Sequence, residues 1–218
     1  MKERKIYLLR HGQPKLESDK KYYMGRLDLD LSNQGIEQAA GLARKFKEMP
    51  LGNIFCSNMK RTEKTAQVIG KYHDIKPQKI KDLCEINLGD WEGRTFEEVR
   101  QRYPEEFKKR GEDIINYCTP NGESFFDVNK RVMKAFYDIL SNTDKNLLIV
   151  GHAGVNKLIL CNIRNIPIED MFKIRQNYAC INIIHQRDKE FEIKLLNGKY
   201  NERGNLKCYN SKHGLHVH

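Results

Sequence analysis

The apolar residues of this chain fall into two kinds of segment that alternate along it. Short, nearly continuous apolar runs are typical of buried strands, and apolar residues spaced three or four apart are typical of amphipathic helices. The predicted strands are residues 5–10, 53–57, 78–86, 146–152, 179–186 and 191–196. The predicted helices are residues 31–49, 59–73, 95–113, 122–140 and 155–163. This alternation predicts an α/β fold, a three-layer α/β/α sandwich around a mostly parallel central sheet.

Local signals define some of the ends of these elements. Ser32 and Thr95 are residue types that cap helix N-termini, and the helix containing Thr95 is expected to break before Pro104. The strand over residues 78–86 is expected to run into a loop. The run NLLIVGH, residues 146–152, is continuous and apolar, which is typical of a parallel strand buried on both faces.

The chain has 218 residues, a length that one domain can hold. No internal repeat or low-complexity linker divides it. We therefore expect one domain over residues 1–198, followed by a polar, weakly patterned C-terminal tail over residues 199–218.

The charge of the chain is strongly positive, with 39 Lys and Arg against 29 Asp and Glu and a formal net charge of +10. A charge of this size fits nucleic acid, an acidic membrane face or a small anionic substrate. The basic residues are scattered, however, and acidic residues lie among most of them, as in EEFKKRGED. This pattern is typical of solvated helix faces, so we expect no nucleic-acid or membrane partner, which leaves a small anionic substrate.

The cysteines show neither a C-x-x-C pair nor zinc-site spacing. They are Cys56, Cys84, Cys118, Cys161, Cys180 and Cys208. Several lie within apolar runs, so we expect buried, reduced thiols and a cytoplasmic protein. The N-terminal apolar stretch IYLL is too short for a signal peptide, and no run approaches the length of a membrane span. We expect no bound metal and no cofactor, and the pattern favours no particular oligomeric state.

Candidate functional residues follow the predicted strands. Arg10 and His11 come at the end of the first strand, and His152 ends the apolar run NLLIVGH. Arg61 comes shortly after a further strand, and Glu85 lies where another gives way to a loop. Because ligands of open α/β sheets bind beyond the C-terminal ends of the strands, we expect these side chains to meet in one pocket.

Two arginines, two histidines and a carboxylate form a set suited to phosphoryl transfer. Arginines bind phosphoryl oxygens in a bidentate manner and offset their charge. A neutral histidine can attack phosphorus. A carboxylic acid can protonate the departing oxygen, and its carboxylate can then activate water. The predicted helix that starts near Gly154 would add backbone N–H groups to the same pocket.

Six motifs in order, from about Lys5 to Leu196, resemble those of the histidine phosphatase superfamily, which has the phosphoglycerate-mutase-like fold. They are LLRHGQ, GRLDLDLSNQGIEQA, CSNMKRTEKTA, EINLGDWEG, PNGESFFDV and IVGHAG. The resemblance implies that His11 is the nucleophile and that Glu85 is the proton donor. The groups implied to hold the phosphoryl group are the side chains of Arg10, Arg61 and His152 and the backbone at Ala153.

Two places depart from the family pattern. Many members have an Asn a few residues after R-H-G, where this chain has Glu17. A carboxylate there would repel a phosphoryl group, so we do not assign that role to Glu17. Asn58 and Met59 stand where many members have Pro-Leu, and we interpret this change as structural.

Two of the same motifs allow other interpretations of their polar residues. Glu92 and Asp90 are alternatives to Glu85 as the acid, and the family pattern favours Glu85. The residues NGESF are expected to cap a helix through Ser124 and to do no more.

The resemblance covers both phosphatases and mutases. Mutases of the family have a longer insertion after the acid loop, with an arginine pair that grips a second anionic group. Here the segment over residues 94–126 is short and its KKR run is followed by acids, which favours a metal-independent phosphatase that acts through a phosphohistidine. The forms RHGQP, GRLDLDLS, YPEEF and GES resemble bacterial small-molecule phosphatases, including α-ribazole phosphatases, so α-ribazole 5′-phosphate is one expected substrate. The alternatives are a cofactor-dependent phosphoglycerate mutase and a non-catalytic phosphate-binding interaction protein.

Overall fold

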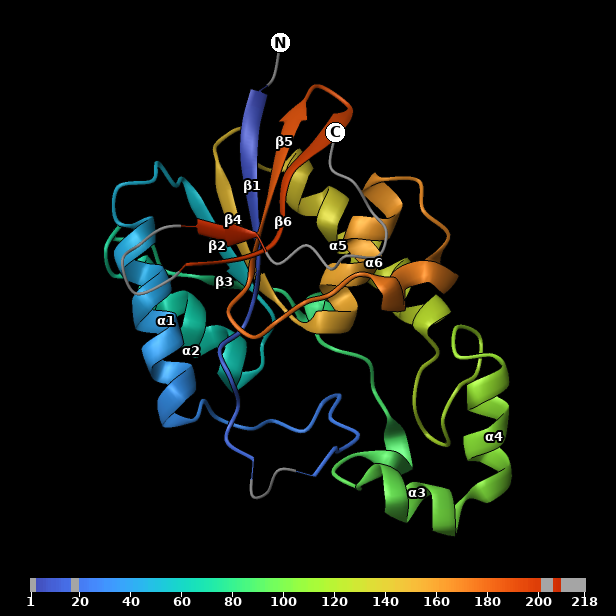
Figure 1. Ribbon diagram of the computed structural model, residues 1–218. Coiled ribbons are helices and arrows are strands. Elements are labelled where there is room, and N and C mark those ends of the chain that lie inside the picture. The colour runs from blue at the N-terminus through green and yellow to red at the C-terminus, as the bar shows by residue number, and fades with distance from the viewer. Residues whose placement is uncertain (1–2, 17–19, 201–205, 209–218) are drawn as a thin grey trace.

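The computed structural model describes residues 3–16, 20–200 and 206–208. The strands in these ranges are β1 (Glu3–Arg10), β2 (Asn53–Cys56), β3 (Gln78–Lys79), β4 (Leu147–Gly151), β5 (Ile181–Arg187), β6 (Glu190–Tyr200) and β7 (Leu206–Cys208). They form one sheet in the order β3-β2-β4-β1-β5-β6-β7 (Figure 1). Strands β3, β2, β4 and β1 pair with one another in parallel. Beyond β1, the strands β5, β6 and β7 extend the sheet with antiparallel pairs.

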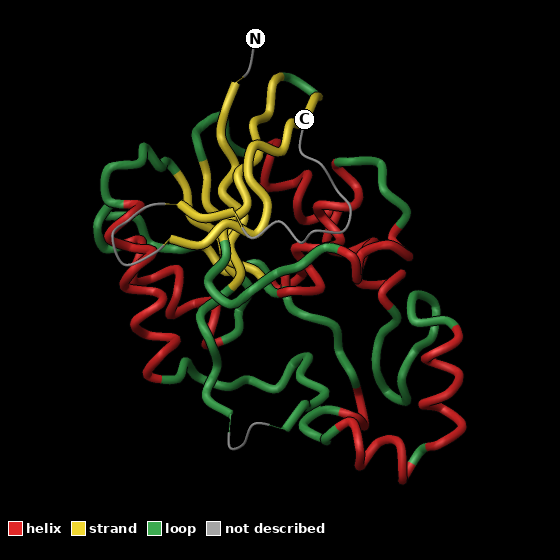
Figure 2. Tube along the Cα trace, viewed as in Figure 1, coloured by secondary structure: helices red, strands yellow, loops and turns green. Residues whose placement is uncertain are grey.

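Helices cover both faces of the sheet. The α-helices are α1 (Asn33–Phe46), α2 (Lys60–Gly70), α3 (Phe96–Arg102), α4 (Pro104–Glu112), α5 (Phe125–Ser141) and α6 (Ala153–Ile163). Short 3₁₀ helices are η1 (Lys81–Leu83), η2 (Gly89–Trp91) and η3 (Ile168–Lys173). Helices α1 and α2 lie on one side of the sheet and α5 and α6 on the other, whereas α3 and α4 lie apart from it (Figures 1 and 2). The predicted α/β/α sandwich with a mostly parallel sheet is confirmed.

Alternate residues of β1 belong to the two cores on either side of the sheet. Ile6 and Leu8 pack in the core that includes α5 and α6, whereas Tyr7 and Leu9 pack in the core that includes α1 and α2. Successive side chains of a strand point to opposite faces, so a strand covered on both faces consists of continuous apolar residues. This is why the apolar runs of the sequence identified the central strands.

The helix ends also follow the sequence signals. The Ser32 hydroxyl accepts a hydrogen bond from the backbone of the first turn of α1. Thr95 caps α3 in a capping box with Glu98, in which each side chain bonds to the other residue's backbone. The helix predicted over residues 95–113 is broken as expected, because Pro104 is the first residue of α4.

The strand predicted over residues 78–86 is largely absent. Only Gln78 and Lys79 pair with β2, and the chain then turns into η1. Leu83 and Ile86 are buried in the core that includes α5 and α6, although neither lies in a strand. The apolar residues therefore reflect burial of a loop against the core. The same loop carries Glu85, and its irregular path turns that carboxylate toward the ends of the parallel strands.

The expected tail does not begin as an irregular segment. β6 runs through residue 198 to Tyr200, and Leu206–Cys208 pairs with it as β7. The rest of the tail lies outside the described residues, so the domain division at residue 198 stays a prediction. Among the cysteines whose side chains are described, Cys118 is exposed, contrary to expectation, and the others are free and buried as expected. Over the described ranges, no helix is long and apolar enough to cross a membrane.

Candidate active site

The two histidines of the sequence prediction lie side by side at the C-terminal ends of β1 and β4. These strands are parallel neighbours, with Arg10 opposite Gly151, and the next residues are His11 and His152. The centroids of the two imidazole rings are 5.2 Å apart. Both side chains are almost completely buried, with His11 3% and His152 1% exposed. The strand-end argument therefore predicted their proximity correctly.

The His11 ring is held in one tautomer. Its Nδ1 lies 2.6 Å from the backbone carbonyl oxygen of Gly12. A carbonyl oxygen can only accept, so Nδ1 carries the proton and Nε2 keeps its lone pair. Burial, and then the charges of Arg61 and Arg10, lower the pKa of His11 well below its ordinary value of 6.5. The ring is therefore neutral near pH 7, with Nε2 available as a nucleophile.

Gly12 allows this loop to approach α1 closely. A Cβ on Gly12 would lie 2.5 Å from the carbonyl oxygen of Gly35 in α1. The Gly12 N–H also donates to the Thr65 hydroxyl of α2 at 3.2 Å. The R-H-G sequence thus continues the strand into a turn that packs against both helices of that layer.

Arg61 is fixed by two backbone carbonyls, and its Nε is left without a partner among the described residues. Its side chain is 1% exposed. Nη1 donates to Leu27 at 2.7 Å and Nη2 donates to Gly25 at 2.8 Å. Nε is buried and has no hydrogen-bond partner among the described residues. Since a buried donor without a partner is costly, this nitrogen is free to bind an anionic ligand.

Arg10 is placed in a similar way. Its Nη1 donates to the Gln176 carbonyl oxygen at 2.6 Å, and its guanidinium carbon lies 3.7 Å from the centroid of the Tyr178 ring. Its Nε is also buried without a partner in the described part of the chain. The charges of Arg10 and Arg61 both lower the pKa of His11 and of His152, so the four groups share one small region.

His152 is the N-cap residue of α6. Its Nε2 lies 2.8 Å from the Ser57 hydroxyl, which in turn lies 2.7 Å from the Thr62 hydroxyl. Its Nδ1 is buried with no partner among the residues described. Burial, and then the charge of Arg61, lower the pKa of His152 well below 6.5, so this ring is also neutral. Arg10, Arg61 and His152 each contribute a buried nitrogen without a partner, which is the arrangement expected around a phosphoryl group.

Glu85 reaches the same region from the irregular loop. It is 8% exposed, and its Oε2 accepts a hydrogen bond from the Gly154 N–H at 2.9 Å. Its Oε1 accepts from Ile86 N–H at 3.1 Å. The carboxylate thus lies at the N-terminus of α6, next to Ala153. As the first residue of α6, Ala153 has an N–H with no intrahelical acceptor.

The two alternative acids have other environments. The Glu92 carboxylate accepts backbone N–H bonds from Gly25, Arg26, Leu27 and Leu88, at 2.6–3.1 Å. It holds the loop whose carbonyls bind Arg61, and so it is occupied structurally. Asp90 is exposed, and its Oδ1 accepts from the Asn121 side chain at 3.1 Å. Of the three carboxylates, Glu85 is the one that bonds to the first turn of α6, the helix that His152 precedes.

Outcomes for the remaining sequence candidates are mixed. The interpretation of Asn58 as structural agrees with its contact, because its Oδ1 accepts from the Cys84 thiol at 2.6 Å. Met59 is 5% exposed and is the N-cap residue of α2. Glu17 lies outside the described residues. Among the described residues, no group of three or more His, Cys, Asp or Glu is arranged to hold a metal ion.

Tyr178 is a wall of the site that the sequence patterns missed. Its ring covers Arg10 and lies 5.7 Å from the His11 ring, centroid to centroid. The next residue, Ala179, has a φ of 56°, which is unusual for a residue with a side chain. Its N–H donates to the His11 carbonyl oxygen at 3.1 Å. No motif or periodicity marks this loop, so only the folded chain brings it to the site.

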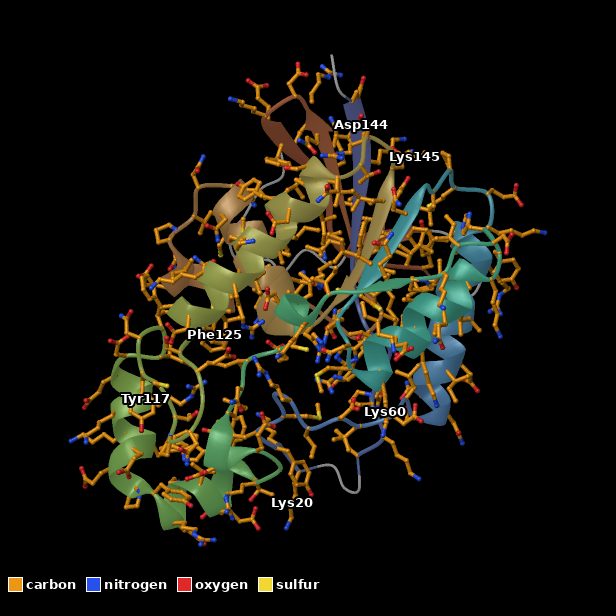
Figure 3. The ribbon with its side chains drawn as sticks, turned by 180° about the vertical axis from the view of Figure 1, so that it is seen from behind. Lys20, Lys60, Tyr117, Phe125, Asp144 and Lys145 are labelled. Carbon is orange, nitrogen blue, oxygen red and sulfur yellow. The ribbon has the colours of Figure 1, made fainter. Side chains whose placement is uncertain are left out.

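Phe125 lines the outer side of the proposed acid. A Cβ placed on Gly154 would lie 3.2 Å from the Phe125 ring. Figure 3 shows Phe125 at the start of α5, where the segment that carries α3 and α4 meets the body of the protein. The Phe125 ring packs edge-on against Phe172, with centroids 5.5 Å apart, and the Lys157 ammonium lies 5.0 Å from the centroid of the Phe172 ring. These side chains form an aromatic and cationic rim next to Glu85.

A neutral histidine with a free lone pair, beside two arginines that have buried unpartnered donors, is suited to accept and return a phosphoryl group. With these groups at the C-terminal ends of parallel strands, the chain has the features of an α/β phosphoryl-transfer enzyme. The comparison with known families makes this specific. The family model of the histidine phosphatase superfamily (branch 1) matches residues 6–199, so the chain belongs to this superfamily.

Several relatives are named as phosphatases. An adenosylcobalamin/alpha-ribazole phosphatase of Escherichia coli K12 is 28% identical over 197 residues, covering 89% of this chain and 96% of that protein. Phosphoserine phosphatase 1 of Hydrogenobacter thermophilus is 29% identical over 195 residues, covering 88% and 92%. The crystal structure of the alpha-ribazole phosphatase from Shigella flexneri superposes with a TM-score of 0.83 at 27% identity, covering 88% and 96%. The chain is therefore a phosphatase, a hydrolase of phosphoric monoesters, as the sequence predicted.

Proposed function

We propose that this protein hydrolyses a small phosphorylated metabolite through a covalent phosphohistidine on His11, without a metal ion. The observation that carries the proposal is the His11 tautomer. The hydrogen bond from Nδ1 to the Gly12 carbonyl oxygen leaves the Nε2 lone pair free in a buried, cationic pocket. The buried Nε atoms of Arg10 and Arg61 support the same proposal, because they supply positive charge where other enzymes use a metal ion.

In the first step, Nε2 of His11 attacks phosphorus and the bond from phosphorus to the ester oxygen breaks. Glu85, protonated in this step, gives its proton to the departing oxygen, so the alcohol leaves neutral. Arg10, Arg61 and His152 bind the phosphoryl oxygens, together with the N–H of Ala153. Their interactions strengthen as charge spreads over those oxygens in the transition state.

In the second step, water attacks the phosphorus of the phosphohistidine. The Glu85 carboxylate takes a proton from that water, and the bond from Nε2 to phosphorus breaks with its electron pair returning to the ring. Inorganic phosphate leaves, and Glu85 and His11 are restored to their starting protonation states. Glu85 thus acts as acid and then as base at one position.

For the substrate, we propose α-ribazole 5′-phosphate as the first candidate. The names of the Escherichia coli and Shigella flexneri relatives support this candidate, and so does the exposed ring of Phe172, which offers apolar surface to a flat base. The Hydrogenobacter thermophilus relative supports phosphoserine as the comparison substrate. We place the reaction in the cytoplasm, where the free thiols of the described cysteines would stay reduced.

The test is a phosphate-release assay with the purified full-length protein. p-Nitrophenyl phosphate establishes whether the protein is a catalyst or only binds phosphate. A panel of α-ribazole 5′-phosphate, phosphoserine and 3-phosphoglycerate then ranks the substrates by kcat/KM. For 3-phosphoglycerate, inorganic phosphate and 2-phosphoglycerate are both measured, with and without 2,3-bisphosphoglycerate. We expect phosphate release without activation by the bisphosphate. Isomerisation faster than phosphate release would establish the mutase alternative, and no turnover of any substrate would establish the non-catalytic one.

A further inference from the structure

Glu123 and Arg131 form an ion pair behind the loop that carries Glu85. Arg131 Nε donates to Glu123 Oε1 and Nη2 donates to Oε2, both at 3.0 Å, so the pair is bidentate. The Arg131 side chain is only 15% exposed and the Glu123 side chain only 21%. The sequence pattern assigned NGESF to a helix cap through Ser124, which the structure shows. Glu123 has a separate set of partners that the cap does not explain.

The remaining N–H groups of Arg131 all bind backbone carbonyl oxygens of residues 82–85, the part of the chain that carries Glu85 and is called here the acid loop. Nη1 donates to the carbonyl oxygens of Asp82 and Cys84, both at 2.7 Å. Nη2 donates to the carbonyl oxygen of Glu85 at 3.1 Å. Together with the two bonds to Glu123, these contacts use all five guanidinium donors. One side chain of α5 therefore fixes the backbone leading up to and including Glu85.

Glu123 holds the other side of the same loop. Its Oε2 accepts from the Asn87 N–H at 2.9 Å, and its Oε1 accepts from Arg26 Nη2 at 3.0 Å. Burial raises the pKa of Glu123, but the hydrogen bonds from Arg131 and Asn87 outweigh this effect and leave it below its ordinary value. The carboxylate is therefore ionised, and the ion pair braces the loop on both sides of Glu85.

The loop needs such bracing because it has no regular secondary structure. η1 ends at Leu83 and η2 begins at Gly89. Cys84 and Leu88 bond to these two turns, but no helical or sheet hydrogen bond positions residues 85–87 between them. The Glu85 carboxylate must nevertheless meet the Gly154 N–H and the ester oxygen of a substrate. An error of about 1 Å in placing a catalytic group can cost on the order of 100-fold in rate.

We propose that the Glu123–Arg131 pair positions Glu85 for proton transfer to the leaving group. This inference rests on the proposed role of Glu85 as the acid. All five donors of Arg131 bind Glu123 and backbone carbonyl oxygens, so it acts through the backbone of the acid loop. Lysine cannot replace it, because an ammonium has three donors and no planar fork to span a carboxylate and three carbonyl oxygens.

The test compares the phosphorylation step for two leaving groups in single-turnover experiments on the full-length protein. Glycerol phosphate needs a proton on its departing alkoxide, whereas p-nitrophenolate departs without one. We expect Arg131→Lys to slow glycerol phosphate by about 10–100-fold and p-nitrophenyl phosphate by less than about threefold. Combined with Glu85→Gln, Arg131→Lys should cause no further loss with glycerol phosphate, because the acid that it positions is already absent.

Glu123→Gln provides a second variant of nearly unchanged shape, and it should show the same selectivity should Arg131→Lys fold poorly. Lys134→Met is the control on the same helix, since it removes the exposed pair with Asp138 and should leave both rates unchanged. One outcome would overturn the positioning role and leave Glu85 as the acid. In it, Arg131→Lys and Glu123→Gln slow both substrates equally, whereas Glu85→Gln still slows glycerol phosphate more than p-nitrophenyl phosphate. Equal losses in Glu85→Gln itself would overturn Glu85 as the acid, and with it this inference.

Discussion

The contact between Glu85 and Gly154 leads to a quantitative prediction for Gly154→Ala. The new Cβ would lie 2.4 Å from Glu85 Oε1. Ordinary contact begins near 3.4 Å, so the carboxylate must retreat by roughly 1 Å. The Phe125 ring, 3.2 Å from the same Cβ, blocks the alternative of moving the helix outward. Because 1 Å of misplacement costs on the order of 100-fold in rate, we expect kcat for an alkyl phosphate to fall by about that factor.

The same substitution should alter stability only modestly. Alanine is favoured over glycine in a helix by about 0.5–1 kcal/mol, and overpacking costs about 1–3 kcal/mol, so the net loss is about 0–2.5 kcal/mol. The assay is steady-state phosphate release at a temperature where thermal melts show both proteins folded. Gly41→Ala is the matched control, because its Cβ would meet only the Arg44 guanidinium at 3.9 Å. A folded Gly154→Ala protein with activity within about threefold of the wild type would refute the reasoning.

Four further predictions concern His11, His152 and the metal-free mechanism. His11→Ala should abolish turnover and leave the fold intact, and phosphate trapped on the quenched wild type should be acid-labile, base-stable and located on His11; trapping on His152 contradicts the assignment. Because burial and then Arg61 lower the pKa of His11 well below 6.5, activity should persist below pH 6.5, and an acid limb of kcat/KM at or above that pH would contradict it. Burial lowers the pKa of His152 in the same way, so below pH 6.5 the unfolded chain binds more protons than the folded protein. Thermal melts should therefore show stability falling as the pH drops from 6.5 toward the pKa values of the two histidines in the folded protein. Exhaustive EDTA treatment should leave activity unchanged, and loss restored by one specific divalent ion would count against the metal-free mechanism.

The proximity of His11 and His152 could be predicted because it depends on regular structure. Both follow continuous apolar runs, and such runs become neighbouring parallel strands whose C-terminal ends lie at one edge of the sheet. The pairing of Arg10 with Gly151 in the register of β1 and β4 is the direct consequence. The place of Arg61 could be predicted for a similar reason, because it lies in the first turn of the helix after β2.

The local structure around Glu85 could not be predicted from the pattern. The residues around it were expected to form a strand, and the strand stops at Lys79. In the loop that follows, Leu83 and Ile86 are buried without any periodicity that distinguishes a packed loop from a strand. The sequence pattern put Glu85 at the end of that expected strand, and the family resemblance favoured it as the acid over Glu92 and Asp90. The loop geometry that positions it depends on contacts with α5, which starts 40 residues later in the chain.

The supporting carboxylates show most clearly why such sites exceed sequence patterns. Glu92 and Glu123 lie in motifs that were noticed, but one was weighed as a competing acid and the other was set aside beside a helix cap. Glu92 instead accepts backbone N–H groups from residues 25–27 and fixes the loop whose carbonyls hold Arg61. Glu123 accepts the Asn87 N–H and fixes the loop that carries Glu85. Helices and strands satisfy their own backbone groups, whereas loops require side chains from elsewhere to do so. A phosphatase site assembled from loops on a rigid sheet therefore depends on carboxylates that hold those loops in place, and these residues leave no period in the sequence.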